Sequence, residues 1–337
     1  MDTKYTRREF AQMMVAAVPA AAAATACAQS RGANTLNSTF NGVKIAVQTY
    51  SYRSMFGYTP GGLRSMEQRR KVVDTIANSV RQNGIEAVEF WIAPMEPVSV
   101  PYNYGAGGSL PTDPKLLQDR ETLRQWRESR PMELFQYAQE AFSSAGIQIY
   151  SAMFNLSETC TDEEILAACD MAEALGTKIM TVNPSIKGVR RAGPLTLKRG
   201  IKLGVHNHNF VNDPDDFATA EALVEATTWS PNIGVTLDIG HFVAGNGDPV
   251  RFVREHHDKI VNLHLKDRYK DDQDPHSDDN VVEWGEGDTP IAEVLQEIVR
   301  GKYSFPATIE YEYPGKESAV VEVGKCLEFA RRALVAA

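Results

Sequence analysis

The chain has 337 residues, of which 43% are hydrophobic and 23% are charged, and its formal net charge is −9. This composition is ordinary for a globular protein and excludes a disordered, collagen-like or multi-span membrane chain. Because 44 acidic residues outnumber 35 basic ones, we expect no nucleic-acid partner, and four cysteines without a CxxC pair exclude a disulfide scaffold or a zinc ribbon.

Residues 1–28 predict an export signal that takes no part in the fold. Arg7-Arg8 precede Phe10, and the alanine-rich run that follows is shorter than the roughly 20 apolar residues that span a bilayer. This pattern is similar to a twin-arginine (Tat) leader and predicts a periplasmic or otherwise exported protein. Cleavage after Ala28 and lipid anchoring at Cys27 both remain open. We expect residues 29–42 to form a linker and residues 43–337 a single domain.

From Val43 onward, short β-branched runs alternate with helical stretches. Eight strand–helix units, with no GxGxxG after the first strand, predict an α/β fold of the closed (β/α)8, or TIM, barrel kind. The predicted strands are Val43–Tyr50, Ile85–Trp91, Ile147–Phe154, Lys178–Val182, Lys202–Val205, Ile233–Leu237, Ile260–Leu265 and Ala307–Tyr311.

Capping residues and glycines predict where the helices begin and end. The predicted helices are 67–82, 133–144, a third from Asp162 to Gly176 with a capping box at Thr161, and a fourth between Ile186 and Gly200, interrupted by Gly193-Pro194. Three later helices are predicted to begin at cap-then-proline pairs, namely Asp213-Pro214, Asp248-Pro249 and Thr289-Pro290. Two connections are too long to be plain loops: Ala93–Pro131 is expected to be either a lid or surface decoration, and the acidic Arg268–Trp284 either partly mobile or surface decoration.

Polar side chains collect where the last four predicted strands end, which is where barrels of this kind carry their chemistry. Alternation along the strands points His206, Asp238, His264 and Glu310 into the barrel mouth at similar height. Two imidazoles and two carboxylates around one axis match the ligands of a single divalent Mn, Zn, Co or Fe ion. The alternative is four separately satisfied polar groups, but burying two negative charges without a cation is expensive.

A second group of polar candidates surrounds these four residues. His208 and Lys266, with Glu312, lie two residues further along the same inward faces, and His241 lies at the lip of the barrel. Glu89 faces inward from the second strand, either as a proton-transfer group or in an ion pair within the barrel. Four aromatic residues are expected either to wall a sugar pocket or to be ordinary core: Tyr50, Trp91, Tyr150 and Phe154.

The chain from Val43 to Leu334 resembles the xylose-isomerase-like barrel superfamily, whose members are often described as sugar phosphate isomerases or epimerases. The motifs that carry the resemblance are GVHNHNF at Gly204–Phe210, TLDIGHF at Thr236–Phe242, LHLKD at Leu263–Asp267, WGEGDTP at Trp284–Pro290 and TIEYEYPG at Thr308–Gly315. The resemblance implies one divalent metal ion held by Asp238, His264 and Glu310. His206 stands where the family has Glu, which leaves the ligand set and a symmetrical two-base mechanism open, with His208 able to take either role.

The resemblance also implies an enzyme that isomerises or epimerises a keto-sugar through an enediolate. Glu310, Glu89 or His208 would remove the proton, and Lys266 or His241 would stabilise oxygen charge or return a proton.

The same residues are also compatible with functions other than isomerisation or epimerisation. β-Elimination from the same enediolate would make a lyase or hydratase of 3-keto-glycosides, and a non-catalytic periplasmic sugar-binding barrel is a further alternative. An abasic-site endonuclease is disfavoured by the acidic charge and by the lack of histidine in the first two strands. Export favours a free sugar or glycoside over a phosphorylated sugar as the small-molecule partner, and a homo-oligomer is compatible with the sequence.

Overall fold

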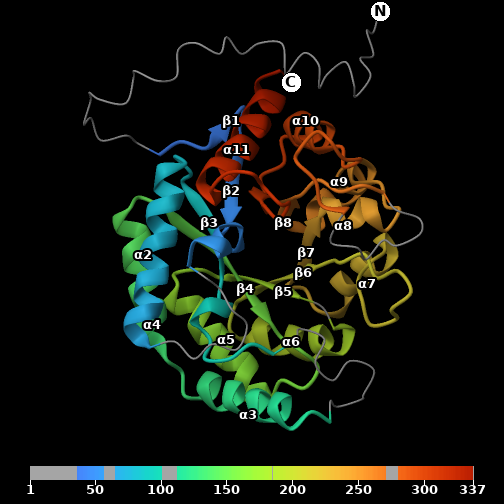
Figure 1. Ribbon diagram of the computed structural model, residues 1–337. Coiled ribbons are helices and arrows are strands. Elements are labelled where there is room, and N and C mark those ends of the chain that lie inside the picture. The colour runs from blue at the N-terminus through green and yellow to red at the C-terminus, as the bar shows by residue number, and fades with distance from the viewer. Residues whose placement is uncertain (1–35, 57–64, 101–111, 184, 271–279, 337) are drawn as a thin grey trace, which may run out of the picture. The chain divides into compact units, whose positions relative to one another are not determined.

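A closed barrel of eight parallel strands, seen in Figure 1 around one axis with helices outside, forms the core and confirms the predicted (β/α)8 fold. The computed structural model describes residues 36–56, 65–100, 112–183, 185–270 and 280–336. Parallel pairing of Val47 in the first barrel strand with Ile309 in the last closes the cylinder. The barrel strands are β2 (Val43–Gln48), β3 (Ala87–Trp91), β4 (Gln148–Asn155), β5 (Ile179–Asn183), β6 (Lys202–His206), β7 (Ile233–Asp238), β8 (Ile260–Leu265) and β9 (Ala307–Ile309).

The helices of the described residues follow the strands along the chain. They are α2 (Met66–Gln82), α3 (Pro114–Glu128), α4 (Met132–Ser144), α5 (Asp162–Ala174), α6 (Ile186–Lys198), α7 (Ala220–Trp229), α8 (Ile239–Ala244), α9 (Pro249–His256), α10 (Ile291–Gly301) and α11 (Ala319–Val335). The capping box at Thr161 and the cap-then-proline start at Asp248 are both confirmed. Gly84 and Gly146 follow α2 and α4 with φ of 74° and 79°, a left-handed conformation that glycine adopts without strain.

Helix α3 lies within the connection Ala93–Pro131, for which the sequence predicts a lid or surface decoration without specifying a helix. It begins at an Asp113-Pro114 pair, because the Asp113 carboxylate accepts hydrogen bonds from the backbone N–H groups of Lys115 and Leu116. The helix packs its Leu123 into a small apolar cluster with Val98 and Val100. This part of the connection is therefore a packed helix. It begins at a cap-then-proline pair, the same signal that predicts the starts of three other helices.

Three helix predictions are wrong in detail. Asp213 begins no helix, because its side chain accepts a hydrogen bond from the N–H of Asp215 in a local turn, and α7 begins instead after Thr219. Thr289 does not cap α10, because its hydroxyl accepts from the Arg268 N–H, and Pro290 takes the capping position. Helix α6 continues through Pro194 rather than being interrupted there.

Two strands end earlier than predicted, and this places residues at the barrel mouth. β2 ends at Gln48 and runs into a 3-10 helix, η1 (Thr49–Phe56), while β9 ends at Ile309. The N–H of Glu310 still donates to Leu265 O at 3.1 Å, which fixes Glu310 beside the end of β8. At the other end of the barrel, residues assigned to the linker contribute β1 (Thr39–Phe40), which pairs antiparallel with β2.

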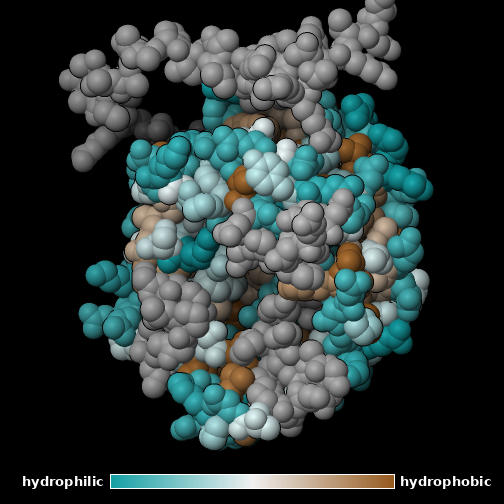
Figure 2. All heavy atoms as spheres, turned by 45° about the vertical axis from the view of Figure 1, so that its right-hand side comes forward, coloured by the Kyte–Doolittle hydropathy of each residue, from teal (hydrophilic) through white to brown (hydrophobic). Residues whose placement is uncertain are grey.

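Figure 2 shows one face of the molecule, on which the described residues are mostly hydrophilic and hydrophobic side chains lie in scattered spots. None of the helices in the described ranges combines the length and the apolar character needed to cross a bilayer. The predicted export signal, along with residues 101–111 and 271–279 of the two long connections, lies outside the described residues.

Candidate metal centre

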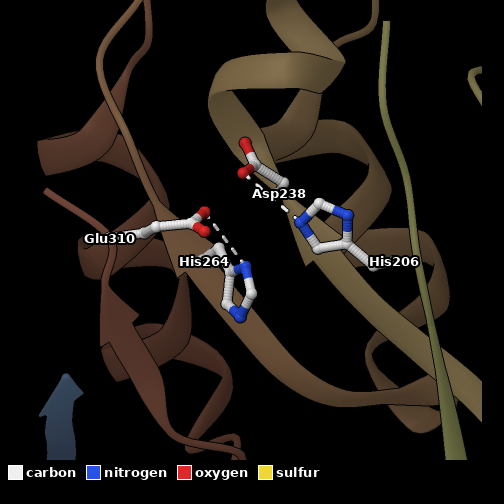
Figure 3. Close-up of side chains that lie close together, drawn as sticks. All are labelled: His206, Asp238, His264 and Glu310. Carbon is white, nitrogen blue, oxygen red and sulfur yellow. Dashed lines mark ion pairs between the residues drawn. The ribbon is translucent and has the colours of Figure 1, made fainter. Parts of the chain in front are cut away.

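Four side chains from four neighbouring strand ends meet at one end of the barrel. His206 ends β6, Asp238 ends β7, His264 lies near the end of β8, and Glu310 directly follows β9. Figure 3 shows these side chains pointing toward one another, and one ligand atom from each lies within 4.8 Å of the others. Glu310, the most exposed of the four, is only 5% exposed. The structure thus brings together the four residues that alternation pointed into the barrel mouth.

Backbone hydrogen bonds hold the Asp238 carboxylate in place. The N–H of Asp238 donates to Asn207 Oδ1 at 2.8 Å, and Asn207 Nδ2 donates to Asp238 O at 3.1 Å, which ties the ends of β6 and β7 together. Asp238 Oδ1 then accepts the N–H of His241 at 2.8 Å as the N-cap of α8. One carboxylate oxygen is thereby used by the fold, and Oδ2 is left for the cluster.

Several atoms in this cluster are buried without a hydrogen-bond partner among the described residues. These atoms are both ring nitrogens of His206, Oδ2 of Asp238, Nδ1 of His264 and Oε2 of Glu310. A buried polar atom without a hydrogen-bond partner is unfavourable, and a cation bound among these atoms would satisfy several of them at once. Mixed imidazole and carboxylate donors suit a divalent transition-metal ion, and the residues present therefore fit the ion that the sequence predicts.

Lys266, just beyond the end of β8, brings a positive charge to the same carboxylates. Its Nζ lies 3.1 Å from Asp238 Oδ2, 3.1 Å from Glu310 Oε2 and 2.5 Å from Glu312 Oε2. Burial opposes the charge on Lys266, but the carboxylates outweigh burial and raise its pKa above the ordinary value. Burial likewise raises the pKa values of Asp238 and Glu310, but Lys266 and the nearby histidines outweigh it and lower both. The lysine is therefore an ammonium ion and both carboxyls are ionised.

His208 and His241 stand beside the cluster as neutral imidazoles. The ring centroid of His208 lies 5.1 Å from that of His206 and 5.2 Å from that of His241. Burial lowers the pKa of each well below the ordinary value, and neighbouring positive groups, Lys266 among them, lower it further. His241 Nε2 is 3.2 Å from Lys266 Nζ, so the two predicted helper groups are in direct contact.

Glu89 on β3 lies on the far side of His264 from the cluster. Its Oε2 is 2.5 Å from His264 Nε2, while His264 Nδ1 is 3.3 Å from Glu310 Oε2. Burial by itself lowers the pKa of His264, but these two carboxylates outweigh it and raise the pKa to about 10. Of the two interpretations of Glu89 from the sequence, the contact corresponds to an ion pair within the barrel.

The four aromatic candidates divide between the barrel mouth and the core. Tyr50 and Trp91 form an edge-to-face pair with centroids 4.7 Å apart, and burial together with nearby Glu312 raises the pKa of Tyr50. Tyr150 is core, because its hydroxyl is bonded to Asn262 Oδ1 inside the barrel, and Phe154 is 1% exposed. Of these four aromatic residues, only Tyr50 and Trp91 therefore lie where they can contact a small molecule bound at the cluster.

Sequence reasoning missed three residues that support this site. They are Asn207, which ties β6 to β7; Arg268, whose Nη1 lies 2.8 Å from His241 Nδ1; and Asp267, which accepts the backbone N–H groups of Gly285, Gly287 and Thr289. All three lie inside or next to the motifs at the strand ends. Period-two alternation marks which residues face inward, and it does not reveal side chains that hydrogen-bond along the barrel rim.

Comparisons with known proteins agree with this fold. Residues 78–331 match the family described as xylose isomerase-like TIM barrel. An inosose dehydratase from Lactiplantibacillus plantarum is 23% identical over 150 residues, which is 41% of this chain and about half (49%) of that relative.

Solved structures with the same fold include enzymes of different named activities. The probable 3-DHS dehydratase AsbF of Bacillus anthracis superposes with a TM-score of 0.56 at 16% identity, over 85% of this chain and 98% of that one. A sugar phosphate isomerase/epimerase of Parabacteroides distasonis gives 0.54 at 17% identity, over 94% of this chain and 100% of that one. The IOLI protein, solved with a bound zinc atom, gives 0.57 at 14% identity, over 87% and 98% of the two chains.

Proposed function

This chain belongs to the xylose isomerase-like TIM barrel family, and we propose that it is a metal-dependent isomerase or epimerase of keto-sugars. The observation that carries the proposal is the meeting of two imidazoles and two carboxylates, with buried atoms that lack hydrogen-bond partners, at one end of the barrel. Relatives named as sugar isomerases, epimerases and dehydratases support a sugar-modifying enzyme. The zinc atom bound by the IOLI protein supports a metal ion in this chain.

His206, Asp238, His264 and Glu310 would hold the ion. When bound, a divalent ion would supply Lewis-acid polarisation of a substrate carbonyl, which acidifies the adjacent C–H group. The chain itself must supply a base that removes this proton and a positive charge that stabilises the negative charge developing on the substrate oxygen.

The proton-transfer groups are His208 and Glu310 in this proposal. His208 is an unprotonated base because burial lowers its pKa, and its side chain is 12% exposed, so a substrate can reach it. Glu310 is an ionised carboxylate on the β9 side of the cluster. The ammonium group of Lys266 is held beside the cluster by the carboxylates of Asp238 and Glu310. Its positive charge would stabilise the negative charge that develops on the substrate oxygen. Tyr50 and Trp91 would provide an apolar wall for the sugar ring.

A second candidate is a lyase or hydratase that begins with the same proton abstraction and then expels a β-substituent, as from a 3-keto-glycoside. The relatives named as dehydratases favour it. A barrel that only binds sugars is the third possibility, and it would neither exchange nor release any atom of its ligand.

The test is an exchange screen in deuterated water with the metal-loaded protein and free keto-sugars and 3-keto-glycosides. The proposal predicts deuterium at one carbon of the substrate or product, and retention of about one divalent ion per chain after purification. An isomerase or epimerase rearranges the labelled sugar, whereas a lyase also releases the substituent. The Asp238→Asn variant is the control and should do neither. No exchange with any sugar or metal would rule out proton abstraction.

Export is a further part of the proposal, supported by Arg7-Arg8 and the alanine-rich run that follows them. Changing both arginines to lysine conserves the charge but removes the twin-arginine feature. The double variant should accumulate uncleaved in the cytoplasm, whereas the unaltered protein should be recovered from the periplasm, shortened when cleaved or membrane-attached when lipidated at Cys27. Equal export of both forms, measured by cell fractionation and mass spectrometry, would contradict a Tat route.

A further inference from the structure

Glu89 is placed to orient a metal ligand rather than to meet the substrate. It is fully buried, and His264 lies between it and the cluster. A base for a sugar must be within hydrogen-bond reach of the carbon-bound proton. Nε2 of His264 contacts Glu89, and Nδ1 faces the cluster. In this arrangement a carboxylate orients an imidazole that can bind a metal ion through its other nitrogen.

Hydrogen-bond chemistry decides which nitrogen of His264 carries the proton. An ionised carboxylate can only accept hydrogen bonds, so Nε2, at 2.5 Å from Glu89, must be the N–H nitrogen. With Nε2 used as the donor to Glu89, Nδ1, which faces Glu310 and the cluster, is the nitrogen that would give its proton up and offer a lone pair to a bound ion. A carboxylate behind a ligating imidazole fixes its tautomer and raises its strength as a ligand.

Two neighbouring strands fix the Glu89 carboxylate itself. Gln48 Nε2 on β2 donates to Glu89 Oε2 at 3.2 Å, and Ser151 Oγ on β4 donates to Oε1 at 3.3 Å. Both partners are buried, at 1% and 0% exposed, so water does not compete for the carboxylate. The geometry of Glu89 is therefore set by the barrel wall and does not depend on a ligand at the mouth.

We propose that Glu89 is a positioning residue, which holds His264 with Nε2 protonated and Nδ1 directed at the divalent ion of the cluster. This inference rests on the proposed metal-dependent function and deepens it, because it assigns the ligating nitrogen and a residue that controls metal affinity. It also removes Glu89 from the candidate bases, leaving proton transfer to residues at the barrel mouth.

The test measures zinc affinity by competition with a chromogenic chelator and the His264 tautomer by NMR of protein labelled with ¹⁵N-histidine. Glu89→Gln keeps the shape of the side chain but removes its charge, and zinc affinity should fall about 10- to 100-fold. In the zinc-loaded unaltered protein, His264 should carry its proton on Nε2. Glu86→Gln is the matched control, because Glu86 precedes the same strand and binds Thr39 Oγ1 at 2.6 Å, away from the cluster. It should keep full affinity.

The outcomes separate this inference from the proposed function. Zinc bound equally by the unaltered protein and by Glu89→Gln would overturn the positioning role and leave a metal-dependent enzyme standing. No zinc bound by the unaltered protein would overturn both. If Glu89→Gln does not fold, as judged by circular dichroism, the unaltered protein still decides the question, because a proton on Nδ1 of zinc-loaded His264 would refute the proposal.

Discussion

Replacing Arg127 by methionine should lower the free energy of unfolding by about 3–5 kcal/mol at pH 8. Arg127 on α3 and Glu96 have side chains only 2% and 4% exposed, and Arg127 Nη2 lies 2.6 Å from Glu96 Oε1. Arg127 Nη2 also donates to Asn155 O at 3.0 Å, at the end of β4. The variant would leave a buried carboxylate without its counter-charge and a strand-end carbonyl without its donor.

The size of this loss should depend on pH. Burial raises the pKa of Glu96 and outweighs the opposing attraction of Arg127, so removing Arg127 raises this pKa further. A carboxyl with a higher pKa in the folded than in the unfolded chain gives stability that is present at low pH and lost as pH rises through the folded-state value. Relative to the unaltered protein, Arg127→Met should therefore be less stable at pH 8 than at pH 5.

Thermal melts followed by circular dichroism would measure the effect. With an unfolding entropy of about 2.1 cal/mol/K per residue over roughly 300 folded residues, 3–5 kcal/mol corresponds to a fall in Tm of about 5–8 °C. Arg124→Met is the matched control on the same helix, because Arg124 pairs with Glu121 and Glu128 at the surface and should contribute less than about 1 kcal/mol.

The double variant Glu96→Leu with Arg127→Met should recover most of the loss, because both buried charges are then absent. A double variant as unstable as Arg127→Met, or a loss that is the same at both pH values, would refute the electrostatic explanation.

Asp238→Asn should abolish metal retention, measured by elemental analysis, while circular dichroism stays unchanged; full metal content would remove Asp238 from the site. Lys266→Met should keep the metal, because a nearby positive charge is lost, but should slow deuterium exchange at least about 100-fold. An unchanged exchange rate would exclude Lys266 from the chemistry. Gly240→Ala should cost about 1–3 kcal/mol in thermal melts, because its Cβ would lie 2.7 Å from Lys266 O. An unaltered Tm would show that this backbone contact can relax.

The sequence alone determined the fold and the four residues that meet in the candidate metal centre. Strand–helix alternation predicted the barrel, and period-two alternation placed His206, Asp238, His264 and Glu310 on inward faces, because both patterns depend on local backbone geometry. Where local signals conflicted with tertiary contacts, the predictions failed. Thr289 was expected to cap a helix, but its hydroxyl instead binds the backbone at the end of β8.

Only the tertiary structure decided how the inward residues contact one another. Glu89 and His264 are 175 residues apart in the chain, and they meet because the barrel closes with a register that no local pattern specifies. The same closure gathers three carboxylates from β7 and the residues after β9 around the ammonium group of Lys266. Side-chain direction follows from the alternation of a strand, whereas the partner of a side chain depends on the packing of the whole barrel.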